Sequence, residues 1–440
     1  MKVLIVNTSE SIGGAAIAAN RLTKALLQNG VKAKMLVRDR QTDDATIITF
    51  CSKWKMKWHF LWERFVIWCN NGFGRKNLFS IDIANAGEDI TTLSSFKEAD
   101  VVHLHWVNQG LLSLRNIEKI LSSGKPVVWT LHDMWPCTGI CHHAQGCTGF
   151  HRTCGLCNYL RFPRKYDLSH TVFLEKCRIY QQGTLHLVAV SNWLHQQVKS
   201  SALTGSLPST VIPNTLSLQQ FQIRDKQDSR LKLGLPKEKA IILFGAARID
   251  DPIKGFPTLL KAIEELIASG GFRREDLHLA YFGKIKFPQQ ILPLIPVDYT
   301  DLGWIKDAET LSVIYSAVDT VVCASRYETF GQTLIEAQAC GCLPVSFNNS
   351  GQTDIIQHRK NGYLAEAYST KDLAKGIEWA LTEGKREVSV DDMRNEVIHR
   401  YSGDVVAQQY IKLYEGLLQQ KCLRQTNCIS VVSAENLSVL

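Results

Sequence analysis

The chain has few of the features that mark membrane-spanning, disordered or disulfide-bonded proteins. No window approaches the eighteen or more apolar residues of a spanning helix. The sequence contains no internal repeat and no low-complexity tract, and its first apolar run is too short for a signal peptide. Thirteen cysteines are an odd number, and a reducing compartment keeps most thiols free or metal-bound. We therefore expect a cytoplasmic protein, with peripheral contact to the inner face of the cytoplasmic membrane left open.

Three binding motifs are also missing. The sequence has no Gly-x-Gly-x-x-Gly turn, which weakens a dinucleotide-binding interpretation, and no Asp-x-Asp pair of the kind that holds a catalytic metal. No nucleic-acid-binding motif accompanies the net charge of +8, so no nucleic acid is expected. That modest charge favours anionic partners such as nucleotides, phosphates or an anionic membrane surface.

What the sequence does contain is an alternation of β-branched runs and helical patterns over 440 residues. Such a length predicts two domains, and the alternation predicts βαβ units with parallel sheets, hence an α/β class. The charged stretch after Pro213-Asn214 is the expected link between the two sheets. A last helix is expected near 404–418, and residues from about 421 to 440 lack periodicity, which is typical of a mobile tail.

The most informative stretch is 325–345. Glu328 lies in an expected loop, and Glu336 follows eight positions later in a helix predicted to begin near Gly331. A glycine-containing turn that leads into a helix N-terminus suits a phosphate, and two carboxylates can accept hydrogen bonds from sugar hydroxyls. The alternative is one exposed carboxylate and one on a helix surface.

With Phe330-Gly331 before the helix and Gly-x-x-Pro after it, this stretch resembles the Glu-x7-Glu motif of retaining glycosyltransferases with the GT-B fold, especially glycosyltransferase family 4. The resemblance implies two Rossmann-like doubly wound domains that face each other across a cleft. Residues 1–212 would bind the acceptor and 213–402 the nucleotide-sugar donor. Helix 403–420 would cross back to the first domain, before the tail 421–440.

Two further motifs fit this family. Phe244-Gly-Ala-Ala-Arg248, followed by Lys254-Gly255, resembles a Gly-Arg-x-x-x-x-Lys-Gly motif whose cations hold the donor diphosphate. Fixed cations there would lower the barrier, because negative charge builds on the departing phosphate. Gly13-Gly14, after the first strand, resembles the family's glycine-rich loop. Alternatively, Arg248 and Lys254 are ordinary surface charges.

His132, in Thr130-Leu-His-Asp133, matches a family histidine near the donor sugar, with Asp133 expected to orient it. A purely structural histidine is the alternative. The resemblance assigns the sugar hydroxyls to Glu328, the ribose to Glu336, and the sugar and phosphate to the backbone of Phe330, Gly331, Gln332 and Thr333. The residues after Phe282-Gly-Lys284 are expected to contact the base. No cofactor is required for catalysis, because the cations and the helix dipole supply positive charge.

Five cysteines fall within 137–157, and Cys154-Gly-Leu-Cys157 has the spacing of a zinc knuckle. Cys141 and Cys147 would complete a structural zinc site; a loop of unligated thiols is equally open. The run Thr-Leu-His-Asp-Met-Trp-Pro followed by cysteines resembles a subset of bacterial capsule and exopolysaccharide (colanic-acid-type) glycosyltransferases.

Residues 53–69 form an expected helix in which Trp54, Trp58, Leu61, Trp62, Phe65, Trp68 and Cys69 share one arc. Lys53, Lys57 and Arg64 would flank that arc. A basic, tryptophan-rich face suits a membrane interface; the alternative is a face turned toward the core.

Together these patterns predict a retaining glycosyltransferase that moves a sugar from a nucleotide-diphosphate donor to a lipid-linked or surface-polysaccharide acceptor. A polyprenyl-diphosphate carrier would explain the aromatic helix. Two alternatives remain: a GT-B transferase with a soluble acceptor or a sugar-nucleotide epimerase, and a non-catalytic nucleotide-sugar-binding scaffold.

Overall fold

The computed structural model describes the backbone of residues 1–50 and 53–437, and their side chains except for Lys53 and residues 424–437. The chain divides into two compact units. The first comprises Met1–Val190, His195–Ile212 and Asp404–Leu440, and the second comprises Ser191–Leu194 and Pro213–Gly403. Pro213 is also the residue at which the second domain was predicted to begin.

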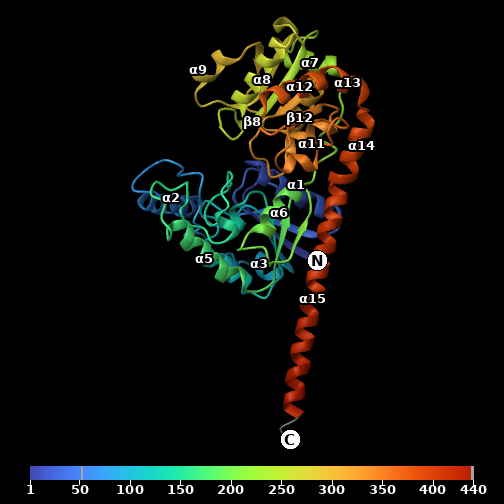
Figure 1. The fold of residues 1–440 in the computed structure, drawn as a ribbon. Coiled ribbons are helices and arrows are strands. Elements are labelled where there is room, and N and C mark those ends of the chain that lie inside the picture. Colours follow the sequence, from blue (N-terminus) through green and yellow to red (C-terminus); the bar gives the residue numbers. More distant parts are fainter. Residues whose placement is uncertain (51–52, 438–440) are drawn as a thin grey trace. The chain divides into compact units, whose positions relative to one another are not determined.

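The first unit contains a seven-stranded sheet in the order β3-β2-β1-β4-β5-β6-β7 (Figure 1). Its strands are β1 (Lys2–Ser9), β2 (Lys32–Asp39), β3 (Ile47–Ile48), β4 (Val101–Leu104), β5 (Val127–Leu131), β6 (Leu185–Ala189) and β7 (Ser209–Val211). Its helices are α1 (Gly14–Gln28), α2 (Lys53–Asn70), α3 (Ser94–Glu98), α4 (Leu114–Leu121), α5 (Leu168–Tyr180), most of α6 (Asn192–Ser200), and α15 (Gly403–Leu437).

The second unit contains a six-stranded sheet in the order β10-β9-β8-β11-β12-β13. Its strands are β8 (Ala240–Arg248), β9 (Leu277–Lys284), β10 (Asp298–Asp301), β11 (Thr320–Cys323), β12 (Leu343–Phe347) and β13 (Tyr363–Ala365). Its helices are α7 (Lys226–Leu233), α8 (Phe256–Ala268), α9 (Pro288–Ile291), α10 (Ala308–Ala317), α11 (Gln332–Ala339), α12 (Thr370–Leu381), α13 (Glu383–Glu387) and α14 (Val390–Tyr401).

All pairings between the described strands are parallel. Parallel sheets need helices on both faces, so their central strands are apolar along their whole length. β5 and β12 show this pattern, since every residue in each of them is buried. The predicted α/β class, with two Rossmann-like parallel-sheet domains, is confirmed.

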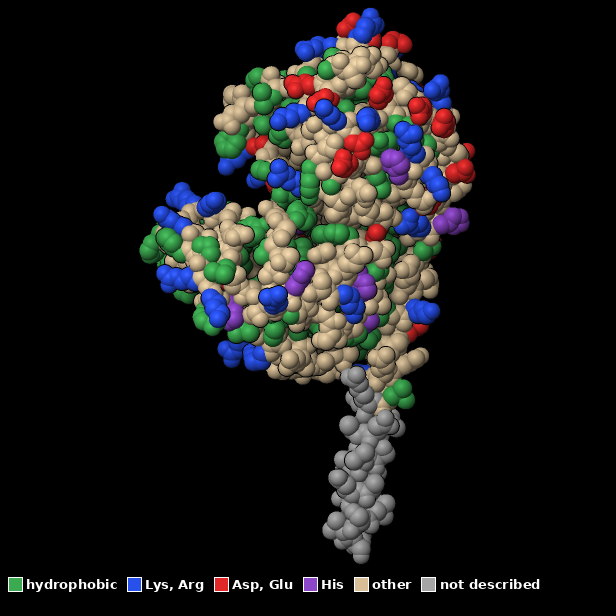
Figure 2. Space-filling view, in the orientation of Figure 1, with side chains coloured by type: hydrophobic (Ala, Val, Ile, Leu, Met, Phe, Trp, Pro, Cys, Tyr) green, Lys and Arg blue, Asp and Glu red, His purple; other side chains and the backbone are tan. Residues whose placement is uncertain are grey.

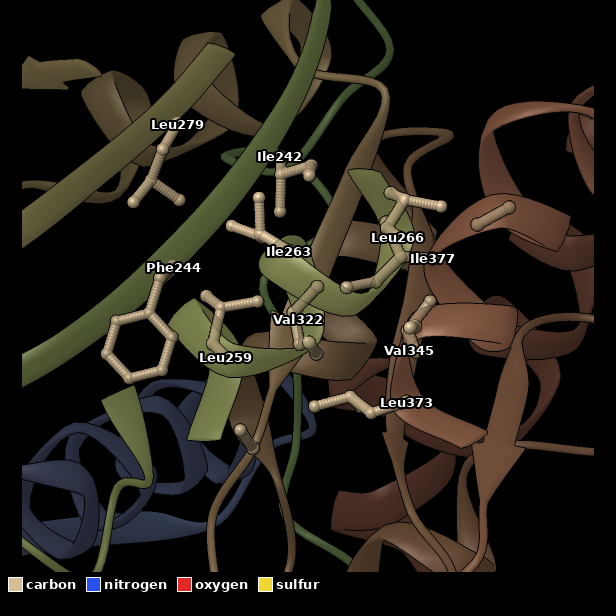
Figure 3. Close-up of a cluster of buried hydrophobic side chains, with 14 of the residues drawn as sticks. Ile242, Phe244, Leu259, Ile263, Leu266, Leu279, Val322, Val345, Leu373 and Ile377 are labelled. Carbon is tan, nitrogen blue, oxygen red and sulfur yellow. The ribbon is translucent and has the colours of Figure 1, made fainter. Parts of the chain in front are cut away.

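The core of the second unit lies between its sheet and the helices α8 and α12. Figure 3 shows Ile242 and Phe244 of β8 with Leu259 and Ile263 of α8, and Leu373 and Ile377 of α12 on the neighbouring part of the cluster. α8 places Leu259, Ile263 and Leu266 on one face, at the three- and four-residue spacing of an amphipathic helix. This packing fixes the strand ends from which the site loops leave.

Helix α15 is longer than predicted. Val406, Tyr410, Tyr414 and Leu417 belong to the core cluster of the first unit, which is where the resemblance implied the last helix would pack. The helix then continues to Leu437 instead of ending near residue 420. No glycine or proline occurs between 417 and 437 to stop it. Residues 438–440 of the predicted tail lie outside the described residues.

Among the described residues, none of the helices combines the length and the apolar composition that crossing a bilayer requires.

Candidate functional site

The predicted donor residues of the second unit lie at the point where its strand order reverses. β8 is flanked by β9, which follows it in the chain, and by β11, which begins 72 residues after β8 ends. Open α/β sheets bind ligands at the carboxyl ends of strands at such a position. The loops after β8 and β11 contact each other, because the Arg326 amide donates to the Ile253 carbonyl at 2.8 Å. Lys254 comes from one loop and Glu328 from the other.

Lys254 and Glu328 form an ion pair in which Nζ lies 2.6 Å from Oε1. The same carboxylate oxygen accepts a hydrogen bond from Ser325 Oγ at 2.8 Å. Burial disfavours the ammonium, but the carboxylate of Glu328 outweighs burial and raises the pKa of Lys254. The lysine therefore keeps its charge in a partly enclosed position. Gly255 makes this approach feasible, since a Cβ there would lie 2.0 Å from the Ala324 carbonyl oxygen and its φ is +73°.

Arg248 is more exposed than Lys254. Its side chain is 52% exposed and has long ion pairs, at 3.5 Å with Asp250 and 3.3 Å with Asp251. Lys284 is its register partner across β8 and β9, and its Nζ lies 5.0 Å from the Trp304 ring centroid. These two cations thus end adjacent strands at the same edge.

Helix α11 begins at Gln332, and its N-cap is Gly331 with φ +108°. A glycine offers no side-chain oxygen to the N–H groups of the first turn, so no side chain caps this helix N-terminus, which is the end of a helix that suits an anion. Phe330 is buried against the ring of Tyr401, at a centroid distance of 5.7 Å. Gln332 and Thr333 are half-buried. The packing of Phe330 against Tyr401 therefore fixes the position of the turn 330–333.

Glu336 is 5% exposed and accepts a hydrogen bond from the Tyr315 hydroxyl at 3.2 Å. Burial, together with this carboxylate, raises the pKa of Tyr315 well above its usual value. The alternative of a helix-surface carboxylate is therefore wrong for Glu336. Tyr315, on α10, was not identified from the sequence because nothing local to it signals the contact.

In the first unit, the loop after β4 contacts the carboxyl end of β1 at the corresponding reversal of strand order. The Thr8 amide donates to the Trp106 carbonyl at 2.8 Å, and the Trp106 amide donates to Asn7 Oδ1 at 2.9 Å. Gly13, with φ +92°, and Gly14 follow on the surface at the start of α1. The predicted glycine-rich loop thus lies at the carboxyl edge of the first sheet.

His132 follows β5 at this edge, and its hydrogen-bond partner is His105. The two atoms involved, His132 Nε2 and His105 Nδ1, are 2.8 Å apart. We predicted that Asp133 would orient His132, but its carboxylate binds His142 Nδ1 at 2.6 Å and Trp106 Nε1 at 2.8 Å. His105 was not predicted as a site residue. It directly follows β4, as His132 directly follows β5, and this shared position was the signal in the sequence that could have identified it.

His142 lies between two buried carboxylates, Asp133 and Asp82, each 2.6 Å away. Burial favours neutral imidazole, but these carboxylates raise the pKa of His142 to about 10. Asp82 also binds Arg64 of α2, whose neighbour Glu63 accepts the amides of Ile83 and Ala84. This buried network ties α2 to the segment that follows β5.

The cysteine-rich segment does not show a metal-binding arrangement. Among the residues that the structure describes, no three His, Cys, Asp or Glu side chains are grouped so that they could hold a metal ion. Burial raises the pKa of the Cys141 thiol to about 12 and that of Cys154 to about 11, whereas Cys147 is exposed. The zinc site predicted from Cys141, Cys147, Cys154 and Cys157 has no geometric support and stays a prediction.

The aromatic stripe of α2 faces outward. Trp54, Trp58 and Trp62 are 76%, 67% and 52% exposed, and Leu61 and Phe65 are exposed beside them. Where Figure 1 labels α2, Figure 2 shows hydrophobic side chains next to Lys and Arg side chains. The alternative in which the stripe packs into the core is therefore wrong. Arg64 does not flank the stripe as predicted, because it is buried against Asp82 on the other face.

Residues 12–220 match the family model "Glycosyltransferase Family 4", and residues 225–396 match "Glycosyl transferases group 1". The chain therefore has the domains of a glycosyltransferase, and the solved structures that resemble it have the GT-B fold. The matched domains support transferase activity.

Three relatives illustrate the similarity. An uncharacterized glycosyltransferase of Methanocaldococcus jannaschii is 28% identical over 248 residues, covering 52% of this chain and 59% of the relative. A protein of Escherichia coli K12 named "Putative colanic acid biosynthesis glycosyl transferase WcaC" is 23% identical over 351 residues, covering 77% of this chain and 82% of the relative. The phosphatidyl-myo-inositol mannosyltransferase of Mycolicibacterium smegmatis is 27% identical over 258 residues, covering 57% and 62%. The chain thus spans between about three-fifths and four-fifths of these relatives.

Two solved structures show the same fold. Sucrose-phosphate synthase from Thermosynechococcus elongatus has a TM-score of 0.65 at 18% identity, with 95% of this chain and 99% of that chain covered. Anabaena HepE, in complex with UDP and glucose, has a TM-score of 0.62 at 16% identity, with 94% and 100% covered.

Proposed function

We propose that the protein is a retaining glycosyltransferase that moves a sugar from a nucleotide-diphosphate donor to a lipid-linked or surface-polysaccharide acceptor. The observation that carries the proposal is the Lys254–Glu328 pair, at the reversal of strand order in the second unit and close to the turn that opens α11. A cation, a carboxylate and a helix N-terminus from neighbouring loops suit a sugar diphosphate.

Each residue has a defined part in this proposal. Lys254 and Arg248 stabilise the negative charge that develops on the leaving diphosphate. Glu328 accepts hydrogen bonds from the sugar hydroxyls, and Glu336 accepts them from the ribose. The backbone of Phe330–Thr333 and the glycine loop Gly13-Gly14 contact the sugar and the phosphates, and Lys284 lies near the base.

Retention of configuration would proceed by front-face substitution. In that step the bond between the anomeric carbon and the diphosphate oxygen breaks, the acceptor oxygen bonds to the same face, and the acceptor proton passes to the departing phosphate. The cations Arg248 and Lys254, with the dipole of α11, would supply the positive charge that the leaving group needs.

The acceptor proposal rests on α2. Its exposed tryptophans, with the exposed basic side chains of Lys55 and Lys57, suit the interface of an anionic bilayer. A polyprenyl-diphosphate carrier would be presented there, on the inner face of the cytoplasmic membrane. The name of the mycobacterial relative, a phosphatidyl-myo-inositol mannosyltransferase, and that of the colanic acid enzyme support a lipid or polysaccharide acceptor.

A thermal-shift screen against uridine and guanosine diphosphates and their sugars tests the donor part, because ligand binding to the native state raises its stability. We expect one nucleotide to raise the Tm of wild type, and a smaller rise in Lys254→Ala. Tight nucleotide binding without transfer would favour the scaffold alternative. Transfer to a free small acceptor without vesicle binding would favour a soluble acceptor.

The structural zinc is tested separately. One zinc per chain by elemental analysis, lost when Cys154 and Cys157 are replaced by serine, would establish it. Metal-free protein with unchanged stability would establish free thiols.

A further inference from the structure

Three histidine rings pack against one another in a stack at the carboxyl edge of the first sheet, in which His103 is tilted against His105 and His105 lies nearly parallel to His132. The ring of His105 lies 4.3 Å from that of His103 and 5.1 Å from that of His132, centroid to centroid, with the last pair 19° from parallel. The backbone of His105 is fixed, because its amide donates to the Val6 carbonyl at 2.9 Å and its carbonyl accepts from Trp129 Nε1 at 2.8 Å. His105 is therefore a rigid neighbour of His132.

Helix α15 holds the inner end of this stack. Both ring nitrogens of His103 are hydrogen-bonded, Nδ1 to the Tyr414 hydroxyl at 2.7 Å and Nε2 to Thr130 Oγ1 at 2.7 Å. Thr130 Oγ1 in turn lies 2.9 Å from the Tyr410 hydroxyl. His103 is consequently fixed at both ring nitrogens, and its ring packs against the ring of His105.

The contact between His105 and His132 contains one proton. Burial lowers the pKa of His105 well below its usual value and that of His132 to about 4, so both rings are neutral near pH 7. One of the two facing nitrogens, His105 Nδ1 or His132 Nε2, must then donate and the other accept. If His132 Nε2 accepts, the single ring proton of His132 is on its Nδ1. If His132 Nε2 donates, its Nδ1 is unprotonated.

The surroundings of His105 Nε2 distinguish between these two tautomers. Its Nε2 has no hydrogen-bond partner among the described residues. If His132 donated, His105 Nε2 would carry a buried N–H without an acceptor, which is costly. If His105 donates from Nδ1, its Nε2 is a buried acceptor that receives no hydrogen bond. This arrangement costs less free energy, since unpaired buried acceptors are tolerated better than unpaired buried N–H groups.

Asp133 does not reverse this choice. Its Oδ2 accepts from His142 and Trp106, and its Oδ1 accepts from the Trp135 amide at 2.8 Å. The carboxylate is therefore committed to three other donors, and it is not arranged as the partner that makes a histidine a strong base.

We propose that His105 is a positioning residue that donates its Nδ1–H to His132 and thereby keeps His132 in the tautomer protonated on Nδ1. His132 then acts as a hydrogen-bond donor to an oxygen of the bound donor substrate, and it does not accept a proton during transfer. The identity of that oxygen rests on the proposed function; the tautomer does not.

The tautomer is measured on full-length protein labelled with 15N-histidine, without substrate. With His132 signals assigned from their loss in His132→Asn, we expect a protonated Nδ1 and an unprotonated Nε2 that do not titrate between pH 6 and pH 8. A proton on Nε2, or titration in that window, would overturn the proposal. This result is independent of whether the protein transfers sugars.

Two matched pairs of variants test the role in turnover. The amide nitrogen of asparagine occupies the place of Nδ1, so His105→Asn should keep the donor and the tautomer, whereas His105→Leu should lose both. Likewise His132→Asn should turn over about tenfold faster than His132→Ala, since one well-placed donor is worth roughly that much or more. Equal rates for His132→Asn and His132→Ala would mean that His132 works as a base and would refute the proposal.

Discussion

Lys254 Nζ lies 2.6 Å from Glu328 Oε1, although 74 residues separate the two in the chain. Each of these two side chains affects the charge or the orientation of the other. The carboxylate keeps the lysine charged, and the lysine orients the carboxylate together with Ser325. A sugar diphosphate that entered here would meet both groups, the cation toward the phosphate and the carboxylate toward the sugar.

Replacing Lys254 by methionine should slow transfer more than it weakens nucleotide binding. The charge on the leaving phosphate is largest in the transition state, so the loss should appear mainly in kcat, by about 100-fold. Steady-state kinetics and a binding titration with the nucleoside diphosphate measure the two effects. The double variant Lys254→Met with Glu328→Gln controls for the unpaired carboxylate. An unchanged kcat in Lys254→Met would remove this residue from the mechanism.

Replacing Glu336 by alanine should weaken donor binding, on the order of 1–3 kcal/mol, because a buried hydrogen-bond acceptor for the ribose is lost. Isothermal titration with the nucleotide measures this. Tyr315→Phe is the matched control, since it removes the hydroxyl that contacts Glu336 and leaves the carboxylate in place. If Tyr315→Phe weakens binding as much as Glu336→Ala, Glu336 supports the helix and does not contact the ribose.

Changing Trp54, Trp58 and Trp62 to serine should release the protein from anionic vesicles without unfolding it, because all three side chains are more than half exposed. Vesicle sedimentation and circular dichroism measure the two properties. Salt should weaken binding of wild type, with Lys57 contributing on the order of 1 kcal/mol near the surface. Met56→Ser, on the buried face of α2, is the control that should affect stability instead. Unaltered sedimentation of the triple variant would refute the membrane proposal.

The buried histidines should make stability depend on pH on the acid side. Burial, and then the neighbouring His132, lowers the pKa of His103 to about 3, whereas an unfolded histidine titrates near 6.5. The contribution is therefore complete above pH 6.5 and is lost as the pH falls from 6.5 toward 3, by about 3 kcal/mol at pH 4. Urea unfolding from pH 7 to pH 4 should give a shallower decline for His103→Gln than for wild type. Parallel curves would contradict the assignment.

The sequence predicted the parallel sheets and the donor motif because both depend on local order. Alternating strands and helices define βαβ units, and Gly255 and Gly331 occupy backbone positions that local spacing already marked. The outward tryptophan arc of α2 was also visible as a period. The sequence did not show whether this arc faces solvent or the core, because periodicity shows which residues share a face of the helix and not what that face contacts.

The contacts that the sequence missed join distant segments. Arg64 was expected beside the stripe, yet Asp82 and the carbonyls of Leu78 and Ile81 draw it inward. Tyr315 contacts Glu336 from another helix, and no local pattern specifies that contact. His105 contacts His132 from the end of another strand, and only its position directly after β4 pointed to it. The end of α15 was missed for the opposite reason: a weakly periodic sequence still continues a helix when nothing interrupts it.

The most direct test of the central claim is the anomeric configuration of the product formed from a nucleotide sugar and lipid-linked acceptor. The proton coupling constants of the new linkage, measured by NMR, report it. We predict acceptor-dependent release of the nucleoside diphosphate, retained configuration, and loss of both product and release in the variant that carries Lys254→Met and Glu328→Gln. An inverted linkage, or unchanged turnover in that double variant, would contradict the account.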